Sequence, residues 1–342
     1  MNQPQDKCSS SQTGGRFDSP PVNRRHVLAG LAAAASLVSL PALRQAYPSK
    51  PVRVVVPYAP GGALDTVARL FSVRMAERLG VSFVVENKPG ANTIIGNEMV
   101  VRAPNDGYTI LFAAAPLALN TALGIKEPYD VLKDLAPVML IATTPGIVFV
   151  NPSTPQRTLA DVIAASKANA NGLSFAAAGV GSMPHLLGEA LRLRTGANLT
   201  HVGYKGSTPA LQDVMGGSVP LMIDAYIPAG VQAAAGKLRG IAVASAKRLS
   251  SLPDIPTTAE QGFPDIVGEA FQAMLVPAGT PRAIVDKLHE AALAVSAEPE
   301  VRDRLTQQGY NIVASSPEGL TEYVTKEINR WSPIVKEAGV KL

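Results

Sequence analysis

The sequence predicts an α/β fold of two lobes, each a mostly parallel sheet flanked by helices. Two separate series of short apolar runs alternate with segments of helical periodicity, and this alternation is typical of sheets covered by helices. A chain of 342 residues has room for two ordinary domains. With 17% charged and 5% aromatic residues, the composition is that of a globular protein rather than a disordered or fibrous one.

The first series opens with the run VRVVV at 52–56. This run is rich in β-branched residues and predicts a buried parallel strand. Apolar residues at helical spacing follow up to Leu79, and Gly80 is expected to end that helix. The series continues with a strand at 81–86, a helix at about 93–102 and a strand at 108–113.

The second series begins near Ile147 and has the same rhythm, without any sequence repeat of the first. Its predicted strands are 147–150, 173–176, 199–202, 219–224 and 240–244, and its predicted helices are 159–168, one ending at Leu193, 209–215 and one ending near Gly236.

The C-terminal part predicts one strand at 269–277 and three helices, which have few strands of their own to cover. The chain is therefore expected to return and complete the first lobe. Residues 47–146 and 273–342 would form that lobe, and residues 147–272 the second. Two crossings, near 146–150 and near 271–277, would make a hinge that lets the lobes close over a ligand.

Residues 1–46 are interpreted as an export signal and leader. A polar stretch leads to Arg24 and Arg25, and an apolar run follows at 27–40 that is too short to span a bilayer. The paired arginines favour the twin-arginine route, and an ordinary Sec signal with a long polar start is the alternative. Cleavage is expected after Ala46 or after Ala42, and the mature protein is expected in the periplasm.

Removal of this segment changes the charge balance of the chain. It holds five of the 31 Lys and Arg residues and two of the 27 Asp and Glu residues, so 26 basic and 25 acidic residues remain. A nearly neutral mature chain gives no argument for nucleic-acid binding. Cys8, the only cysteine, lies in the same segment, so the mature chain needs no disulfide and has no thiolate to bind a metal.

Residues 57–65, PYAPGGALD, carry the strongest local signal. A strand runs into Gly61 and Gly62, which open a helix, and free N–H groups at a helix start form an anion site. A plain strand-to-helix turn is the alternative. Asp65 in the first turn is expected to stabilise the helix end. Loops of similar position follow other strands, at 89–92, 113–116, 179–182 and 205–207, where open α/β sheets bind ligands.

Asp224 ends the strand at 219–224, where it would meet an amine or hydroxyl of a ligand or serve as an ordinary capping residue. Signals for catalysis are weak. The histidines at 185, 201 and 289 lack metal-binding spacing, and Ser182 does not lie in a G-x-S-x-G elbow. A solute-binding protein without cofactor or metal is the favoured function, and a secreted α/β hydrolase, an esterase or amidase, is the alternative.

Five motifs resemble the tripartite tricarboxylate transporter substrate-binding family, also called Bug receptors. They are PSKPVRVVVPYAPGGALDTVAR, VVENKPGANTIIG, GSMPHLLGEALR, HVGYKGSTPALQDVMGG and GKLRGIAVAS, which together span most of the chain after residue 46. The resemblance implies a periplasmic receptor of Venus-flytrap fold for di- or tricarboxylates, amino acids or aromatic acids. It also implies that the receptor serves a tripartite tricarboxylate permease or a sensor protein.

The resemblance also implies the ligand-binding residues. In the first lobe these are Tyr58, Pro60, Gly61, Gly62, Ala91 and Asn92, and in the second lobe Ala178, Gly181, Ser182, Met183 and Asp224. This chain departs from the family pattern at Tyr58, where phenylalanine is usual, at Asn92-Thr93 and at 113–115. Since these departures fall where selectivity is expected, the resemblance does not identify the ligand.

The double substitution Arg24→Lys with Arg25→Lys tests the export route. If the twin-arginine machinery reads the pair, the double variant stays in the cytoplasm, because that route requires both guanidinium groups. Cell fractionation followed by immunoblotting measures the outcome. Export of the double variant at the wild-type level would instead establish the Sec route.

Overall fold

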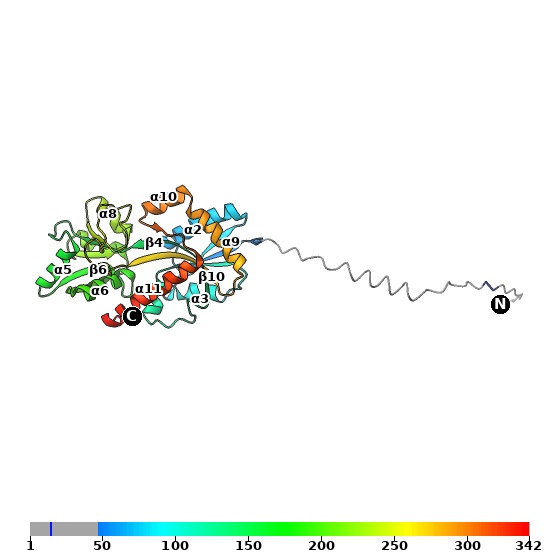
Figure 1. The fold of residues 1–342 in the computed structure, drawn as a ribbon, viewed down its shortest axis with the longest axis horizontal. Helices are drawn as coiled ribbons and strands as arrows, with labels where there is room; N and C mark the ends of the chain where they lie inside the picture. The colour runs from blue at the N-terminus through cyan, green and yellow to red at the C-terminus, as the bar shows by residue number, and fades with distance from the viewer. Residues whose placement is uncertain (1–13, 16–46, 342) are drawn as a thin grey trace, which may run out of the picture. The chain divides into compact units, whose positions relative to one another are not determined.

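The computed structural model describes residues 14–15 and 47–341, so the predicted export signal lies outside the described residues. Residues 47–341 contain two sheets (Figure 1). The first sheet has the strand order β11-β4-β10-β3-β1-β2. Its strands are β1 (Val52–Val56), β2 (Phe83–Asn87), β3 (Thr109–Ala114), β4 (Leu135–Pro145), β10 (Glu269–Pro277) and β11 (Asn311–Ile312).

The second sheet has the order β7-β6-β8-β5-β9 and comes from one continuous stretch of chain. Its strands are β5 (Ile147–Val150), β6 (Leu173–Ala178), β7 (Leu199–Tyr204), β8 (Leu221–Asp224) and β9 (Arg239–Val243). The predicted two-lobed α/β fold is therefore confirmed, with one sheet at the centre of each lobe.

Both sheets are mixed, which corrects the expectation of mostly parallel sheets. Strand β1 pairs in parallel with β2 and β3, and β6 pairs in parallel with β7 and β8. Strand β10, however, runs antiparallel to β3 and β4, and β5 runs antiparallel to β8 and β9. Two strands that are neighbours in a sheet and run parallel need a crossover connection between them, usually a helix. Strands β4, β5 and β10 carry the chain between the lobes without such a helix, so they pair antiparallel.

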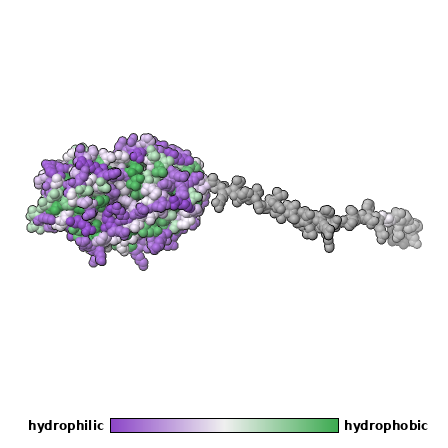
Figure 2. All heavy atoms as spheres, in the orientation of Figure 1, coloured by the Kyte–Doolittle hydropathy of each residue, from purple (hydrophilic) through white to green (hydrophobic). Residues whose placement is uncertain are grey.

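Helices cover both faces of each sheet (Figure 1). In the first lobe they are α2 (Ala63–Leu79), α3 (Ile94–Val101), α4 (Pro116–Ala122), α9 (Arg282–Ser296), α10 (Pro299–Gln307) and α11 (Pro317–Ala338), with the short turn η2 (Ala91–Thr93). In the second lobe they are α5 (Leu159–Ala168), α6 (Met183–Thr195), α7 (Ser207–Met215), α8 (Val231–Ala234) and the π-turn η3 (Tyr226–Gly230). On the face of the molecule in Figure 2, apolar residues form small separate groups among polar ones.

One hydrophobic core joins the two lobes. Alternate residues of β1, β3 and β4 pack under α2 and α9, and the intervening ones face α3, α4 and α11. Helix α11 also contacts α6 of the second lobe, so a single apolar cluster runs from Leu140 through Trp331 to Leu187. The outer face of the second sheet, under α7, has its own cluster around Phe149.

Several predicted elements are confirmed and others were missed. Strands at 52–56 and 147–150 and the helix ending at Gly80 lie as predicted, and Gly80 has the left-handed φ of 71°. Helix α4 and strand β4 were not predicted. Strand β10 pairs with β4 from Glu269 onward, so residues 269–272, expected in the second lobe, belong to the first sheet.

Replacement of Trp331 by alanine tests the importance of the shared core. The side chain is fully buried, and its indole N–H donates to Glu327 Oε2 at 2.9 Å. Trp331→Ala is expected to lower the free energy of unfolding by about 3–5 kcal/mol, the usual cost of emptying a large core site. Denaturant unfolding measures it. The control Leu293→Ala, at a position 42% exposed, should change it by less than about 0.5 kcal/mol, and equal losses would contradict the inference.

Candidate functional site

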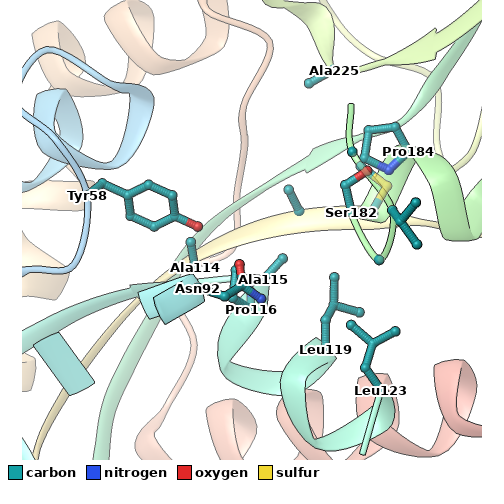
Figure 3. Close-up of a pocket in the computed structure, with 15 residues that line it drawn as sticks. Tyr58, Asn92, Ala114, Ala115, Pro116, Leu119, Leu123, Ser182, Pro184 and Ala225 are labelled. Atoms are coloured by element: carbon teal, nitrogen blue, oxygen red, sulfur yellow. The ribbon is translucent and has the colours of Figure 1, made fainter. Parts of the chain in front are cut away.

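A cavity of 570 Å³ is lined by residues of both lobes (Figure 3). This volume lies in the range of small-molecule binding sites. The first lobe contributes the ends of β1 and β3, the η2 turn and helix α4, and the second lobe contributes the loop after β6 and the residue after β8. The lining residues are Tyr58, Asn92, Ala114, Ala115, Pro116, Leu119, Leu123, Gly179, Val180, Gly181, Ser182, Met183, Pro184, Ala225 and Ala270.

A second cavity of 330 Å³ adjoins the first, because Ala225 and Ala270 line both. It lies at the start of α2, where Gly61, Ala63 and Thr66 form part of its wall. The two cavities together form a cleft between the lobes, which we call the interlobe cleft.

The loop at 178–182 is fixed from behind by side chains of the second lobe. His201 Nε2 lies 3.1 Å from the carbonyl oxygen of Ala178, and Gly181 N–H donates to His185 Nδ1 at 3.1 Å. Ser182 caps α6: its hydroxyl accepts from His185 N–H and donates to Ala178 O at 3.2 Å. The loop is therefore held at its first and last residues.

The middle of this loop keeps its donors free. Among the described residues, no acceptor is bound by the backbone N–H of Gly179 or Val180. Both residues line the cavity, in the loop that leads through Gly181 and Ser182 into α6, a helix of 13 residues. Free N–H groups next to a helix start attract an anion.

The rings of the two histidines behind the loop, His185 and His201, lie against each other at a tilt of 36°, with centroids 4.1 Å apart. Burial, with a contribution from the neighbouring His201, lowers the pKa of His185 to about 4. His185 is therefore neutral at neutral pH, and its Nδ1 carries the lone pair that accepts from Gly181 N–H.

The Gly-Gly turn of the first lobe is organised by Asp65. Gly61 has a left-handed φ of 84°, and its N–H donates to Asp65 Oδ2 at 2.9 Å. Burial would raise the pKa of Asp65, but hydrogen bonds from Arg69, Gly61 and Asn87 outweigh it and lower that pKa. The predicted stabilising role of Asp65 is thus confirmed, and Gly61 N–H is not available to a ligand.

The next two donors of this turn remain available. Gly62 and Ala63 bind no acceptor with their N–H groups among the described residues, and they open α2, a helix of 17 residues. No side chain caps this helix start. It presents the partial positive charge of the helix dipole toward the smaller cavity, which Ala63 lines.

Tyr58 and Asn92 supply polar groups on the first-lobe wall. The Tyr58 hydroxyl points into the cavity, and burial raises its pKa to about 12, so it stays protonated and can donate. Asn92 lies in a left-handed conformation, with φ 49°, and its side-chain amide donates to Asn120 Oδ1. Asn120 in turn donates to Glu127, which fixes the orientation of both amides.

The sequence-predicted site residues divide into two groups. The structure brings Tyr58, Asn92, Gly181, Ser182 and Met183 together around the larger cavity. Of the two cavities, Gly61 lines only the smaller one, and together with Pro60 it also borders an open groove along α2. The remaining predicted residues line neither cavity of the cleft; they are Gly62, Ala91, Ala178 and Asp224.

Asp224 lies just behind the cleft, since the next residue, Ala225, lines both cavities. Its Oδ1 accepts from the N–H of Ala225 at 2.9 Å. Burial raises the pKa of its carboxyl group to about 6.

Sequence reasoning missed several wall residues. Leu119 and Leu123 are four residues apart after Pro116, a spacing that would have placed them on one face of a helix starting at that proline. Ala270 lies inside an apolar strand and carries no local signal. Pro184 and Ala225 directly follow predicted site residues.

Among the described residues, no group of three or more His, Cys, Asp or Glu residues is placed to hold a metal ion. No helix in that part of the chain is long and apolar enough to cross a membrane.

The chain is similar to known proteins both in sequence and in structure. The family model described as "Tripartite tricarboxylate transporter family receptor" matches residues 67–340. Protein BugT of Bordetella pertussis is 34% identical over 94% of this chain and 100% of its own length. The solved periplasmic binding protein BugD is 36% identical, with a TM-score of 0.71 over 86% of this chain and 99% of that one.

Two solved structures are named with a bound ligand. MatC of Rhodopseudomonas palustris, with bound malate, is 32% identical, with a TM-score of 0.71 over 84% of this chain and 100% of that one. Another R. palustris protein, with adipate, is 34% identical, with a TM-score of 0.74 over 86% and 99%. The family match over more than half of the sequence confirms the resemblance predicted from the five motifs. The chain belongs to the tripartite tricarboxylate transporter receptor family, the family of the Bug periplasmic binding proteins.

Proposed function

We propose that this chain is an exported receptor that binds a small carboxylate in the interlobe cleft and catalyses no reaction. The observation that carries the proposal is the set of free backbone N–H groups of Gly62 and Ala63 at the start of α2, and of Gly179 and Val180 in the loop that leads into α6. Such groups bind an anion without a charged side chain. The malate and adipate named with two relatives support a carboxylate as that anion.

The hydrolase alternative requires Ser182 and His185 to work as nucleophile and base. The geometry argues against this role for the pair. The Ser182 hydroxyl donates to Ala178 O, and His185 Nδ1 accepts from Gly181 N–H rather than from the serine. A serine nucleophile needs the base nitrogen at its own hydroxyl.

Closure of the two lobes would trap the ligand. We assign residues 47–146 and 269–342 to the first lobe and residues 147–268 to the second, with the hinge where the chain crosses at Gly146 and Gly268. The position of the cavity supports this arrangement, because its walls come from both sides of the crossings. A hinge at two adjacent crossings lets each lobe move as a rigid body.

Residues 1–46 would direct the chain across the inner membrane and be removed after export. The loaded receptor would then deliver its ligand to a tripartite tricarboxylate permease or to a sensor protein. The family match and the periplasmic relatives support this location, and the family match supports the permease as a partner.

Matched acids and amides test the requirement for a carboxylate. Isothermal titration calorimetry would compare hexanoate with hexanamide and adipate with adipamide. We expect each acid that binds to bind about 10- to 100-fold more tightly than its amide, because hydrogen bonds to a charged acceptor contribute about 1.5–3 kcal/mol each. Amides that bind as tightly as the acids would contradict the carboxylate receptor.

The variant Gly62→Val locates part of the same interaction. A Cβ at Gly62 would lie 3.7 Å from its nearest neighbour, Ala59 O, and φ is −74°, so the fold should tolerate the change. The valine should weaken acid binding while leaving the melting temperature unchanged. The loss of affinity caused by the valine and the loss caused by amidation of the ligand should not add fully, because both changes remove the same interaction.

His185 variants test how the second-lobe donors are held. His185→Leu removes the acceptor of Gly181 N–H and should weaken acid binding about fivefold to tenfold, the value of one hydrogen bond of about 1 kcal/mol. His185→Asn places an amide oxygen near the position of Nδ1 and should retain most of the affinity. Equal losses in both variants, measured by calorimetry, would show that only packing matters.

The pH dependence of stability gives a second readout for His185. Its pKa in the folded protein, about 4, lies below the ordinary value of 6.5. The folded state therefore binds this proton less readily than the unfolded state. Its contribution to stability is complete above pH 6.5 and declines as the pH falls toward 4. His185→Asn should therefore make the melting temperature depend less on pH across this range.

A further inference from the structure

The wall of the larger cavity carries no charged side chain. Only Tyr58, Asn92 and Ser182 have polar side chains among its lining residues. The Ser182 hydroxyl is already engaged in the cap of α6, and the Asn92 amide donates to Asn120. The free polar groups are therefore concentrated at the Tyr58 hydroxyl and the loop donors of Gly179 and Val180.

The remaining wall is apolar and comes from both lobes. Leu119 and Leu123, one turn apart in the α4 segment, face the cavity from the first lobe (Figure 3). Val180, Met183 and Pro184 line it from the second lobe, and Val180 is 48% exposed. An exposed valine beside two leucines leaves apolar surface uncovered until a ligand fills the space.

Carboxyl groups lie directly behind this wall. Asp224 precedes Ala225, Glu269 precedes Ala270, and Glu127 accepts from Asn120, the partner of Asn92. Burial raises the pKa of Asp224 to about 6, and burial with the nearby Glu327 raises that of Glu269 to about 7. Because burial is the main cause of both shifts, each of these two carboxyl groups lies in surroundings that disfavour its own charged form.

We propose that the ligand is a monocarboxylate with an uncharged apolar body, aliphatic or aromatic. Its carboxylate binds the free backbone donors, and its body lies against Leu119, Leu123 and Val180. This proposal rests on the proposed carboxylate receptor and narrows it, because a second charged group placed against these three side chains would have no counter-ion. An unpaired charge is costly to bury, whereas each buried methylene improves affinity by about fourfold.

Three six-carbon acids test the proposal with the wild-type protein. Hexanoate, 6-aminohexanoate and adipate share one carboxylate and differ only at the far end, which is apolar, positive or negative. Calorimetry at pH 7.5 is expected to show hexanoate binding at least about tenfold more tightly than either charged analogue. Adipate or 6-aminohexanoate binding as tightly as hexanoate would overturn the proposal while the carboxylate receptor stands.

Two variants at the apolar wall show where the body lies. Leu123→Asn and Val180→Asn replace side chains that are not fully buried, so folding should survive both changes. Each should weaken hexanoate about fivefold or more and reduce its advantage over 6-aminohexanoate and adipate. The control Leu132→Asn, 44% exposed and outside the cavity wall, should leave all three affinities unchanged.

The outcomes separate the two proposals. Unchanged hexanoate affinity in both wall variants would place the apolar body elsewhere and overturn this inference. If none of the three acids binds at millimolar concentration, and none raises the melting temperature, this inference is overturned, and a wider series of di- and tricarboxylates then tests the carboxylate receptor itself. Hexanoate preference in the wild type, lost in the wall variants and kept in Leu132→Asn, supports both.

Discussion

The structure depends on a short ladder where the chain passes between the lobes. Gly146 N–H donates to Gly268 O at 2.8 Å, Gly268 N–H to Ala244 O at 3.0 Å, and Ala244 N–H to Gly146 O at 2.8 Å. A side chain at the first position would displace Leu187, because a Cβ on Gly146 would lie 2.5 Å from Leu187 Cδ2. This ladder sets the two sheets side by side, so the cavity walls and the shared core under α11 both follow from it.

Local chemistry explains which elements were predictable. The β-branched run of β1 and the glycine after α2 carry their own signals, and both were predicted. The direction of a strand has no such local signal, because a buried apolar run has the same sequence pattern in parallel and in antiparallel pairs. The mixed character of the two sheets was therefore missed. At the site, loops after strands were predictable from glycines, as at Gly181. The walls from Leu119 and Ala270 were not, because they depend on how distant segments meet.

The cleft offers two kinds of surface to a ligand, backbone N–H donors and apolar side chains. Gly179 and Val180 offer donors whose direction is fixed by His185 and His201 from behind, so the site is organised before a ligand arrives. Asp65 performs the same task in the first lobe, where it holds Gly61 and leaves the next N–H groups free. Under the proposed binding mode the main chain recognises the charge, which leaves the side chains on the wall free to vary and to set selectivity.

The sheet order also has a consequence for the sequence of folding events. Strand β10 lies between β3 and β4, yet residues 147–268 separate it from β4 in the chain. The first sheet therefore stays incomplete until residue 312, the end of β11, has been synthesised, whereas the second sheet comes from the single stretch 147–243. Contacts across such a separation carry a large loop-closure entropy and slow folding. We expect the inserted lobe to acquire structure first and to serve as the template on which the interrupted lobe closes.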